Sequence, residues 1–522
     1  MRPNNPPQHP RANLARVPLN RRPNILLIMA DQLSASFLPC YSHPIVDAPN
    51  ISALSERGVT FESAYTNSPL CAPSRFGMLA GQLNSKIGAY DNAAELASSV
   101  PTFAHYLRGA GYQTTLAGKM HFVGADQLHG YEERLTTDIY PADFGWTPNW
   151  DDAATRVDWW FHNMDSVRHA GVADSSNQLD YDDEVRFHAV RKLRDLARSS
   201  DERPWMLTAS FTHPHDPYIA RRQHWDRYDH DDIDLPAVGP IDLSQIDPHS
   251  RRLRKVSDMD ATPVTEAQIL NARHAYYSSI SYIDDRVGEL MATLTSTRMI
   301  ENTIVVFTAD RGDMLGERGL WYKMSFFENA SRIPLIIAGP DIVSGRCSNP
   351  VSLLDLAATL TDLAGAPAPD RTDGHSLVPL IGRTRDPSRI VLGEYMAEGA
   401  VAPIFMIRRG SLKFVRCDAD PDQLYDLSTD AHELTNLAAE PRFAADVAAL
   451  NEMAGKQWDA KAIHANVLQS QRSRRVVDQA LRRGSYTPWD FQPHTDASQR
   501  FMRNHLDLNV VESSRRFPHE DN

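Results

Sequence analysis

Cysteine is scarce in this sequence, and its few copies are far apart. The 522 residues contain four cysteines, none of which forms a Cys-x-x-Cys pair: Cys40, Cys71, Cys347 and Cys417. This spacing excludes a disulfide framework and gives no sign of a zinc site. Because unpaired thiols suit a reducing compartment, the sequence predicts a cytoplasmic protein.

Long apolar runs and an excess of positive charge are also missing. No run of about 18 apolar residues occurs, so no membrane span is expected. Residues 1–22 are rich in Pro, Arg and Asn and lack the apolar core of a signal peptide, which predicts a flexible extension. A net charge of −13 argues against a nucleic-acid partner. An ordinary globular protein remains after these exclusions. The composition, with 42% apolar and 23% charged residues, is typical of that class.

The most informative stretch is residues 68–81, Ser-Pro-Leu-Cys-Ala-Pro-Ser-Arg-Phe-Gly-Met-Leu-Ala-Gly. It predicts a loop and then a short helix, with Pro73 in the first turn and Gly81 at the C-terminal end. Cys71 then lies just before the helix N-terminus, where free amides favour an anion, and Arg75 adds a guanidinium one turn later. A nucleophile beside an anion site indicates chemistry on a sulfate or phosphate ester. The alternative is a buried structural cysteine.

Two apolar segments far apart in the sequence each end in an aspartate. Residues 24–30 and 303–309 have the continuous apolar pattern of strands buried on both faces. Asp31 follows the first strand and Asp310 the second, and the carboxyl ends of parallel strands meet at one edge of a sheet. Both carboxylates and the amide oxygen of Gln32 are therefore candidate ligands for one divalent cation. A capping or turn role is the alternative for each residue alone.

Further candidates lie in short segments between the expected elements. Lys119 and His121 would share one side of an extended segment, which suits an anionic ester and a proton transfer. His215 belongs to a turn that contains two histidines. Residues 140–161 are unusually aromatic. Core packing under a long loop is the common explanation, and an aromatic wall for a quaternary ammonium group is the alternative.

The pattern changes near residue 400. Two alternating segments flank Gly410-Ser411, which predicts a β-hairpin. The tail after Ser473 is polar but carries aromatic residues, so disorder and docking on its own or a neighbouring subunit are both open. The expected parts are a flexible extension (1–22), a catalytic domain (23–387), an α+β subdomain (388–468) and a C-terminal extension (469–522).

The motif Cys71-x-Pro73-Ser74-Arg75, with its Leu-Ala-Gly ending, resembles the signature of the sulfatases, a family of the alkaline-phosphatase-like superfamily. Further positions that match the family pattern are Asp31, Gln32, Asn92, Lys119, His121, His215, Asp310 and Lys323. A narrower resemblance, to the choline sulfatases, is carried by residues 67–92, 119–150, 210–218 and 312–328 and by parts of the tail. The resemblance implies an α/β fold with a large mixed, mostly parallel sheet sandwiched by helices, a smaller C-terminal α+β subdomain and an extended tail.

The resemblance also implies a mechanism. A formylglycine-generating system would oxidise Cys71 to formylglycine, and a calcium ion would be held by Asp31, Gln32, Asp310 and residue 71. Arg75 would neutralise the sulfuryl group of a small-molecule sulfate ester. The remaining implied roles are protonation of the leaving alkoxide by His215 and Lys323, proton removal by His121, and orientation of sulfate oxygens by Lys119 and Asn92. The family resemblance further suggests a homo-oligomer.

In the choline sulfatase interpretation, Trp146 is a candidate cation–π face for the trimethylammonium group. A carboxylate would complete that pocket. Glu398 is the first candidate, and Asp507 from the tail is the second. Each could equally be a solvated surface acid.

One position departs from the family pattern. The family places His or Asn after the second metal-binding aspartate, and here that residue is Arg311, whose guanidinium cannot ligate a metal. Three alternatives follow: Arg311 turns outward and Asp313 or water fills the gap, Arg311 binds the sulfate directly, or metal binding and activity are weak. The alternative functions are an arylsulfatase, a phosphonate or phosphate monoester hydrolase, and a non-catalytic ligand binder.

Overall fold

The computed structural model describes residues 22–152, 162–382, 386, 388–494, 505, 507 and 509–511. The expected flexible extension therefore lies outside the described residues except for Arg22. The aromatic residues at 159–161 and most of the tail after 494 also lie outside them. Among the described residues, no helix combines the length and the apolar character needed to cross a membrane.

A nine-stranded sheet lies at the centre of the described chain, in the order β11-β2-β10-β8-β1-β6-β3-β4, with β9 pairing to β2. Strand β10 is antiparallel to both of its neighbours, and the other adjacent pairs along this path are parallel. This sheet confirms the predicted large, mixed, mostly parallel architecture. The strands are β1 (Asn24–Ala30), β2 (Gly58–Tyr65), β3 (Gln113–Gly118), β4 (Glu133–Arg134), β6 (Trp205–Ser210), β8 (Thr303–Ala309), β9 (Arg332–Ile333), β10 (Leu335–Ala338) and β11 (Gly345–Ser352).

Strands β1 and β8 are direct neighbours although 278 residues separate Gln32 from its hydrogen-bond partner Asp310. Their last residues, Ala30 and Ala309, are paired in register. Since the strands are parallel, the residues that follow them emerge at the same sheet edge. The sheet thus brings Asp31 and Asp310 side by side, as their positions after two apolar runs predict.

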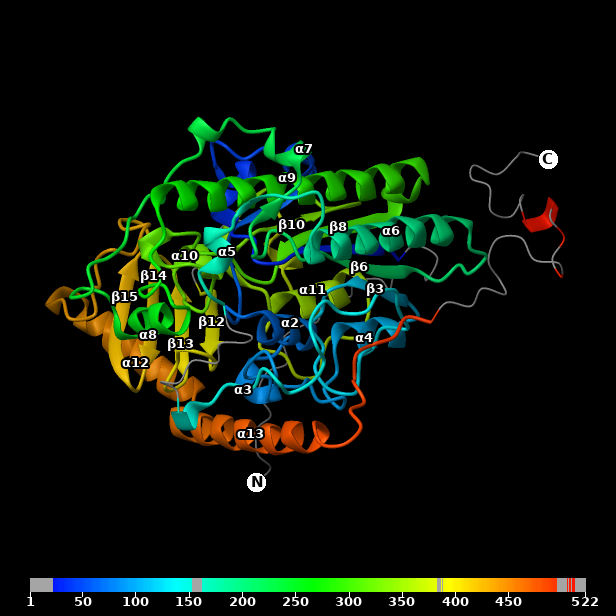
Figure 1. Ribbon diagram of the computed structural model, residues 1–522. Helices are drawn as coiled ribbons and strands as arrows, with labels where there is room; N and C mark the ends of the chain where they lie inside the picture. The colour runs from blue at the N-terminus through cyan, green and yellow to red at the C-terminus, as the bar shows by residue number, and fades with distance from the viewer. Residues whose placement is uncertain are drawn as a thin grey trace, which may run out of the picture.

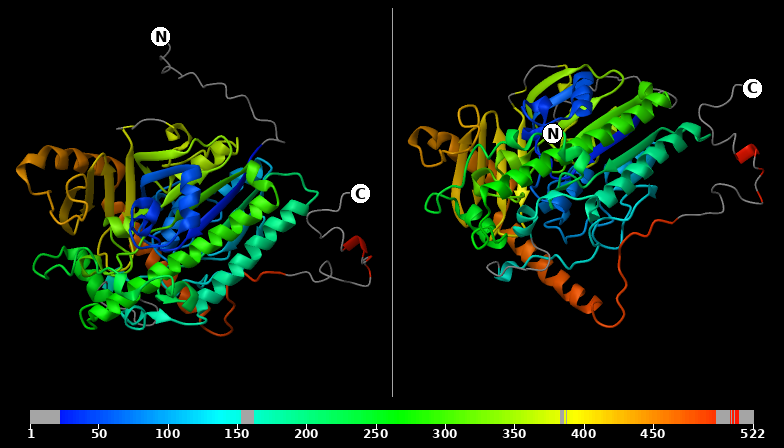
Figure 2. Two further views of the ribbon diagram at one scale, coloured as in Figure 1. Left: turned by 90° about the horizontal axis from the view of Figure 1, so that it is seen from above. Right: turned by 45° about the horizontal axis from the view of Figure 1, so that its top comes forward.

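Helices cover both faces of the sheet (Figures 1 and 2). On one face lie α6 (Asn177–Arg198) and α9 (Glu266–Ser296), and on the other lie α2 (Cys71–Ala80), α4 (Phe103–Gly109) and α11 (Asp355–Leu363). Thr265 and Gln268 form a capping box at the start of α9. The shorter elements are α1 (Pro49–Arg57), α3 (Asn84–Ile87), α5 (Asp165–Arg168), α7 (Arg222–Trp225), α8 (Pro248–Val256), α10 (Glu328–Ser331), β5 (Gly171–Val172) and β7 (Ile219–Ala220).

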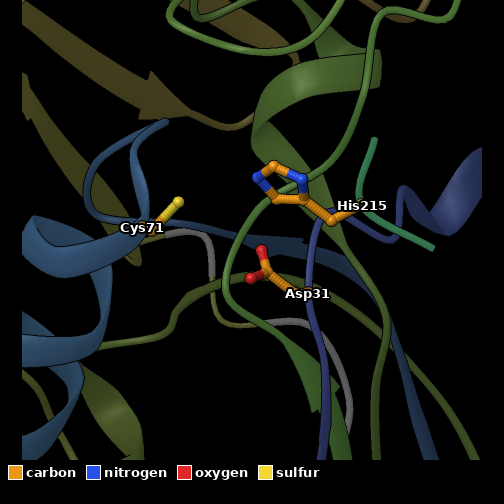
Figure 3. A group of neighbouring side chains, drawn as sticks. All are labelled: Asp31, Cys71 and His215. Carbon is orange, nitrogen blue, oxygen red and sulfur yellow. The ribbon is translucent and has the colours of Figure 1, made fainter. Parts of the chain in front are cut away.

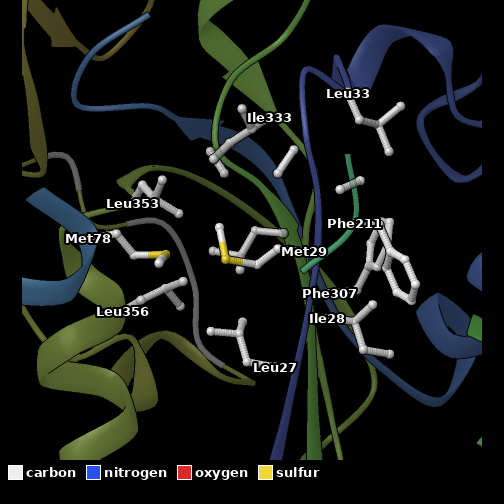
Figure 4. Packing of buried hydrophobic residues seen from close by; sticks show 14 of the residues in the cluster. Leu27, Ile28, Met29, Leu33, Met78, Phe211, Phe307, Ile333, Leu353 and Leu356 are labelled. Atoms are coloured by element: carbon white, nitrogen blue, oxygen red, sulfur yellow. The ribbon is translucent and has the colours of Figure 1, made fainter. Parts of the chain in front are cut away.

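The side chains of β1 alternate between the two helical layers (Figure 4). Leu27 and Met29 lie on the side of Met78 in α2, and Ile28 lies on the side of Phe307. All of these side chains are fully buried. Burying each apolar side chain stabilises the fold by roughly 1.5–3 kcal/mol. The edge that carries the site residues is therefore held by a packed core on both faces.

A second, four-stranded antiparallel sheet follows the main one in the sequence. It consists of β12 (Ile390–Tyr395), β13 (Ile404–Arg409), β14 (Leu412–Cys417) and β15 (Asp420–Asp426). The hairpin predicted at Gly410-Ser411 joins β13 to β14, with Gly410 at a φ of 59°. Helices α12 (Ala444–Gln457) and α13 (Ala460–Leu481) complete this part.

Helix α13 returns to the main domain. Arg474 donates two hydrogen bonds of 2.7 Å to the buried carboxylate of Asp91, and Gln471 accepts one of 2.9 Å from the amide of Trp150. A buried bidentate arginine–carboxylate pair is a directional contact. It fixes α13 against the loops around residues 90 and 150.

Candidate active site

Helix α2 presents Cys71 at its N-terminus. The helix begins at Cys71 itself rather than two residues later, because the Leu70 carbonyl already accepts a 3.0 Å hydrogen bond from the Ser74 amide. Pro73 lies in the first turn and Gly81 ends the helix at a φ of 67°, as predicted. The first-turn amides of a helix have no partner within the helix, and here Asn92 accepts a 3.0 Å hydrogen bond from one of them, the Ala72 amide.

Three side chains from separate elements face one space (Figure 3). Cys71 comes from α2, Asp31 follows β1, and His215 lies in the loop after β6. Their possible ligand atoms all lie within 4.8 Å of one another, and all three residues are buried. The predicted nucleophile, one predicted metal ligand and the predicted proton donor therefore share one centre.

Cationic side chains surround this centre. Lys119 is paired with Asp31, Lys323 donates to Gln32 Oε1 at 2.8 Å, and both lysines are buried. Burial raises the pKa of the Cys71 thiol, but the cations, led by Arg311, outweigh burial and hold that pKa well below its ordinary value. Burial and then the repulsion of Arg311 lower the pKa of Lys323. This environment favours negative charge on residue 71.

Arg75 links the two sheet-edge aspartates. Its Nε donates to Asp310 Oδ2 at 2.9 Å, its Nη1 donates to the Lys119 carbonyl at 2.6 Å, and its Nη2 lies 3.7 Å from Asp31. The buried Nη2 has no hydrogen-bond partner. A buried donor without a partner lowers the stability of the folded protein. An anionic oxygen that bound beside Nη2 would supply the missing acceptor and would itself be stabilised.

His215 is oriented by a residue that sequence reasoning missed. Its Nδ1 lies 2.5 Å from the Asp216 carbonyl and 3.1 Å from Asp216 Oδ1, so Nδ1 carries a proton and donates. Its Nε2 lies 3.0 Å from Lys323 Nζ, which places the two predicted proton donors in contact. Asp216 also contacts His162 Nδ1 at 3.0 Å. The run His-Pro-His-Asp-Pro was the available signal for Asp216.

His121 is close to Lys119, although not by the predicted geometry. Strand β3 ends at Gly118 and His121 has a φ of 62°, so the segment is a turn rather than an extended strand. Asp138 causes this turn by accepting hydrogen bonds from two successive amides, including that of His121 at 2.8 Å. The Tyr140 ring lies 4.2 Å from Lys119 Nζ and 5.0 Å from the His121 ring. Neither nitrogen of the buried His121 imidazole has a partner.

A cavity of about 420 Å³ opens beside Cys71. Its lining includes Cys71, Asn92, Tyr140, Trp146, His215, Lys323 and Glu398. Trp146 packs against Tyr140 and the edge of His121, with ring centroids 5.0 and 5.8 Å apart. Three of the predicted catalytic residues, Cys71, His215 and Lys323, therefore share one cavity with the predicted cation-binding residues Trp146 and Glu398.

Glu398 is 6% exposed and neither of its carboxylate oxygens has a hydrogen-bond partner. Burial raises its pKa to about 8. Buried carboxylates are normally paired with a cation or a hydrogen-bond donor. The Glu398 carboxylate can therefore bind a cationic group or a hydrogen-bond donor of a ligand. Asp507, the second candidate, is exposed, accepts the amides of Asn509 and Val510, and does not line the cavity.

The sulfatase family profile matches residues 23–366. The chain belongs to the sulfatase family. Two further profiles match its C-terminal part: that of the N-sulphoglucosamine sulphohydrolase C-terminal region at residues 316–458, and that of the choline sulfatase enzyme C-terminal region at residues 465–517. The chain is thus a sulfuric ester hydrolase of this family.

Among curated proteins, the chain is 52% identical to the choline-sulfatase of Rhizobium meliloti over 506 residues, which covers 95% of this chain and 99% of the relative. It is 30% identical to arylsulfatase K of Danio rerio, covering 80% and 81% of the two chains. Among solved structures, the phosphonate monoester hydrolase of Agrobacterium radiobacter has the same fold, with a TM-score of 0.68 at 24% identity over 85% of this chain and 96% of that chain.

Membership of the family implies, in general terms, a divalent metal ion and a formylglycine residue. In the part of the chain that the structure describes, two groups have the spacing to hold an ion: Asp31 with Cys71 and His215, and His162 with His215 and Asp216. The ligand set predicted from the sequence, which is Asp31, Gln32, Asp310 and residue 71, differs from both groups. Cationic side chains already contact its oxygen atoms. Arg311 Nη2 lies 2.8 Å from Asp31 Oδ1 and Arg311 Nη1 donates to Gln32 Oε1 at 2.7 Å.

A divalent ion on those oxygens would lie beside the Arg311 guanidinium. Two unit charges about 4 Å apart interact by about 4 kcal/mol at an effective dielectric constant of about 20, and a divalent ion doubles that repulsion. Although burial opposes the charged form, Cys71 and Asp31 hold the pKa of Arg311 well above its ordinary value, so the guanidinium stays charged. The predicted ligand set therefore does not fit a divalent ion while Arg311 lies where the structure has it. The same holds for the group of Asp31, Cys71 and His215, because Arg311 contacts Asp31 and Cys71.

Proposed function

We propose that this sulfatase hydrolyses choline O-sulfate to choline and sulfate, with a nucleophile formed from Cys71. The 52% identical relative is a choline-sulfatase, and a choline sulfatase C-terminal profile matches the end of the chain. The observation that carries the substrate assignment is the buried carboxylate of Glu398, which has no partner and lines the same cavity as Cys71. A carboxylate and an aromatic face suit a quaternary ammonium group.

The proposed pose uses two parts of the cavity, named here the Cys71 end and the Glu398 end after the lining residue that defines each. The sulfuryl group lies at Cys71, where the orphan Nη2 of Arg75 and the Lys119 ammonium stabilise its oxygens. The trimethylammonium group lies between Trp146 and Glu398. Asn92, which already holds the start of α2 through the Ala72 amide, lies beside the sulfuryl position.

When Cys71 is oxidised to formylglycine, its hydrated aldehyde supplies the oxygen that attacks sulfur and later lets sulfate depart. His215 and Lys323 stabilise the leaving choline oxygen. They pass to it, through Nε2 and Nζ, the proton that the attacking hydroxyl loses, because an alkoxide is a poor leaving group. Asp216 keeps His215 in the required orientation through Nδ1. His121, with both ring nitrogens unpartnered, takes the proton that is released when sulfate departs. Water restores the resting site, so the overall reaction is ester plus water to alcohol plus hydrogen sulfate.

Other parts of the proposal concern assembly and location. A formylglycine-generating system is the required partner for Cys71, a cytoplasmic location suits four free cysteines, and the chain forms a homo-oligomer. The calcium ion expected from the family resemblance takes part in no step here, because its predicted ligands contact Arg311.

The test is substrate discrimination by the full chain, produced together with a formylglycine-generating enzyme. Mass spectrometry of the peptide covering residues 67–84 first establishes the oxidation of Cys71. Sulfate release is then compared for choline O-sulfate and its uncharged isostere, 3,3-dimethylbutyl sulfate. We expect a preference of about 100-fold for the cation, because a buried charge pair and a cation–π contact both discriminate against the isostere.

Equal rates on these two esters would remove the choline assignment. Faster hydrolysis of 4-nitrophenyl sulfate, or of a phenyl phosphonate ester, would instead favour the arylsulfatase or phosphonate hydrolase functions. The similarity to arylsulfatase K, and the fold shared with the phosphonate monoester hydrolase, keep these alternatives open. No release of any ester from the oxidised protein would favour a ligand binder.

A further inference from the structure

Arg311 occupies the centre of the site. It follows Asp310 directly after β8 and is fully buried. Its Nη2 lies 2.8 Å from Asp31 Oδ1 and 2.6 Å from Cys71 Sγ, and its Nη1 lies 2.7 Å from Gln32 Oε1. One guanidinium therefore contacts three of the four residues that the family resemblance assigns to a divalent ion.

The fourth residue is also already paired with protein groups. Asp310 Oδ2 accepts from Arg75 Nε at 2.9 Å, and Asp310 Oδ1 accepts from the Gln32 amide at 3.1 Å. The second oxygen of Asp31 is paired with Lys119, and Gln32 Oε1 accepts a second hydrogen bond from Lys323 at 2.8 Å. The predicted set thus offers an ion only oxygens that already contact cationic side chains or a backbone amide.

The charges of this set lead to the same result. Two carboxylates, those of Asp31 and Asp310, face four buried cationic side chains, those of Arg75, Lys119, Arg311 and Lys323. A site for a divalent ion normally offers the ion an excess of negative oxygens. Here the carboxylates of Asp31 and Asp310 are already paired with the cationic groups of Arg75, Lys119 and Arg311, and water cannot screen a buried group.

We propose that the Arg311 guanidinium excludes a divalent ion from this site and takes over its position as the cation between Asp31, Gln32 and residue 71. A guanidinium has a fixed planar fork of donors, which suits a carboxylate, an amide oxygen and a sulfuryl oxygen at once. The exclusion follows from the geometry alone. The further assignment, that Arg311 holds the nucleophile and the sulfuryl oxygens, rests on the proposed function.

The test measures metal content, not only activity. The full chain and the Arg311→His variant are dialysed against Ca²⁺, Mg²⁺ or Mn²⁺, freed of loose ions, and analysed by plasma mass spectrometry. We expect far less than one ion per chain for the original protein and about one per chain for the variant, because imidazole can ligate where guanidinium cannot. Arg346→His is the matched control, since its side chain is half exposed and pairs with Glu62 at the surface.

Thermal unfolding with and without a chelator gives a second readout. Ligand binding to the native state raises Tm, so the chelator should lower Tm of Arg311→His and leave Tm of the original protein and of Arg346→His unchanged. Arg311→Asn serves as the second variant where Arg311→His does not fold. If neither variant folds, the metal content of the original protein decides the proposal.

One equivalent of tightly held ion in the original protein would overturn the proposal. Failure of both folded variants to take up any ion would also overturn it, because Arg311 would then not be the cause of exclusion. Sulfate release from choline O-sulfate is measured on the same samples. Its absence in the metal-free original protein would count against the proposed function and leave the result on metal content standing.

Discussion

The two ends of the cavity differ in how their charges are paired. At the Cys71 end, Asp31 contacts three cationic side chains and Asp310 contacts Arg75. At the other end, the Glu398 carboxylate is buried with no partner. The first end is a preorganised place for an anion, whose charged groups are fixed before the substrate arrives. The second end is complete only when a cationic ligand supplies the missing charge.

The largest effect should come from the Cys71 end. Cys71→Ala removes the source of the nucleophile, and we expect sulfate release to fall by about 10⁴-fold or more, as for other covalent catalysts. Binding of choline O-sulfate, measured by calorimetry, should persist because the opposite end is intact. Cys40→Ala, at a partly buried position that does not line the cavity, is the control. Residual activity near the original level would show that residue 71 is not the source of the nucleophile.

The second effect tests the other end alone. Glu398→Gln keeps the shape of the side chain and removes its charge, so kcat/KM for choline O-sulfate should fall by about 100-fold, the scale for breaking a buried charge pair. The rate on the uncharged 3,3-dimethylbutyl sulfate should change little. Glu202→Gln, at an exposed position, controls for loss of a surface carboxylate. An equal loss on both esters would mean that the two ends do not act separately.

The third effect is a dependence on pH. The pKa of Glu398 is raised to about 8 by burial, so in the free protein the carboxyl must lose a proton before it can bind a cation. Choline affinity, measured by calorimetry, should therefore rise by up to tenfold per pH unit below about 8 and level off above it. Asp91, Lys323 and residue 71 are the other charged groups that influence this carboxyl, and they are unchanged in Glu398→Gln. That variant should lose the pH dependence, and a variant that kept it would locate the titration elsewhere.

The same pKa shift predicts the sign of a stability effect. Because the pKa is raised in the folded state, the contribution of Glu398 to stability is present below the ordinary value of 4.5 and is lost as the pH rises through about 8. Over that range, Tm of the original protein should fall relative to Tm of Glu398→Gln. Parallel Tm curves would show that the carboxyl is paired in solution.

The smallest effect should come from the aromatic face. Trp146→Leu keeps an apolar side chain but removes the ring, and we expect about a tenfold loss in kcat/KM for choline O-sulfate. Trp146→Phe should recover part of this loss because it restores a ring face. Phe187→Leu, at an exposed position, is the control. If Leu and Phe at position 146 behaved alike, the ring would act only by filling space.

Sequence reasoning reached the fold because its signals were local and regular. The apolar runs 24–30 and 303–309 coincide with β1 and β8, and the predicted Gly410-Ser411 hairpin is present. It also named several residues of the cavity lining, since Cys71, His215, Lys323 and Glu398 lie in short motifs or in a recognisable family context. The turn at His121 was missed because Asp138, seventeen residues away, imposes it through two backbone hydrogen bonds.

The sequence by itself determined which residues end the buried strands, because a run of apolar side chains needs no distant partner to be recognised. Only the tertiary structure decided that Asp216 orients His215, that Glu398 lacks a partner, and that Arg311 points inward between Asp31 and Cys71. These three outcomes depend on which charged groups the folded chain brings within a few ångströms of one another. Coulomb interactions depend on the distance between charges in space and on their burial. Neither of these can be read from the number of residues between two charges in the sequence.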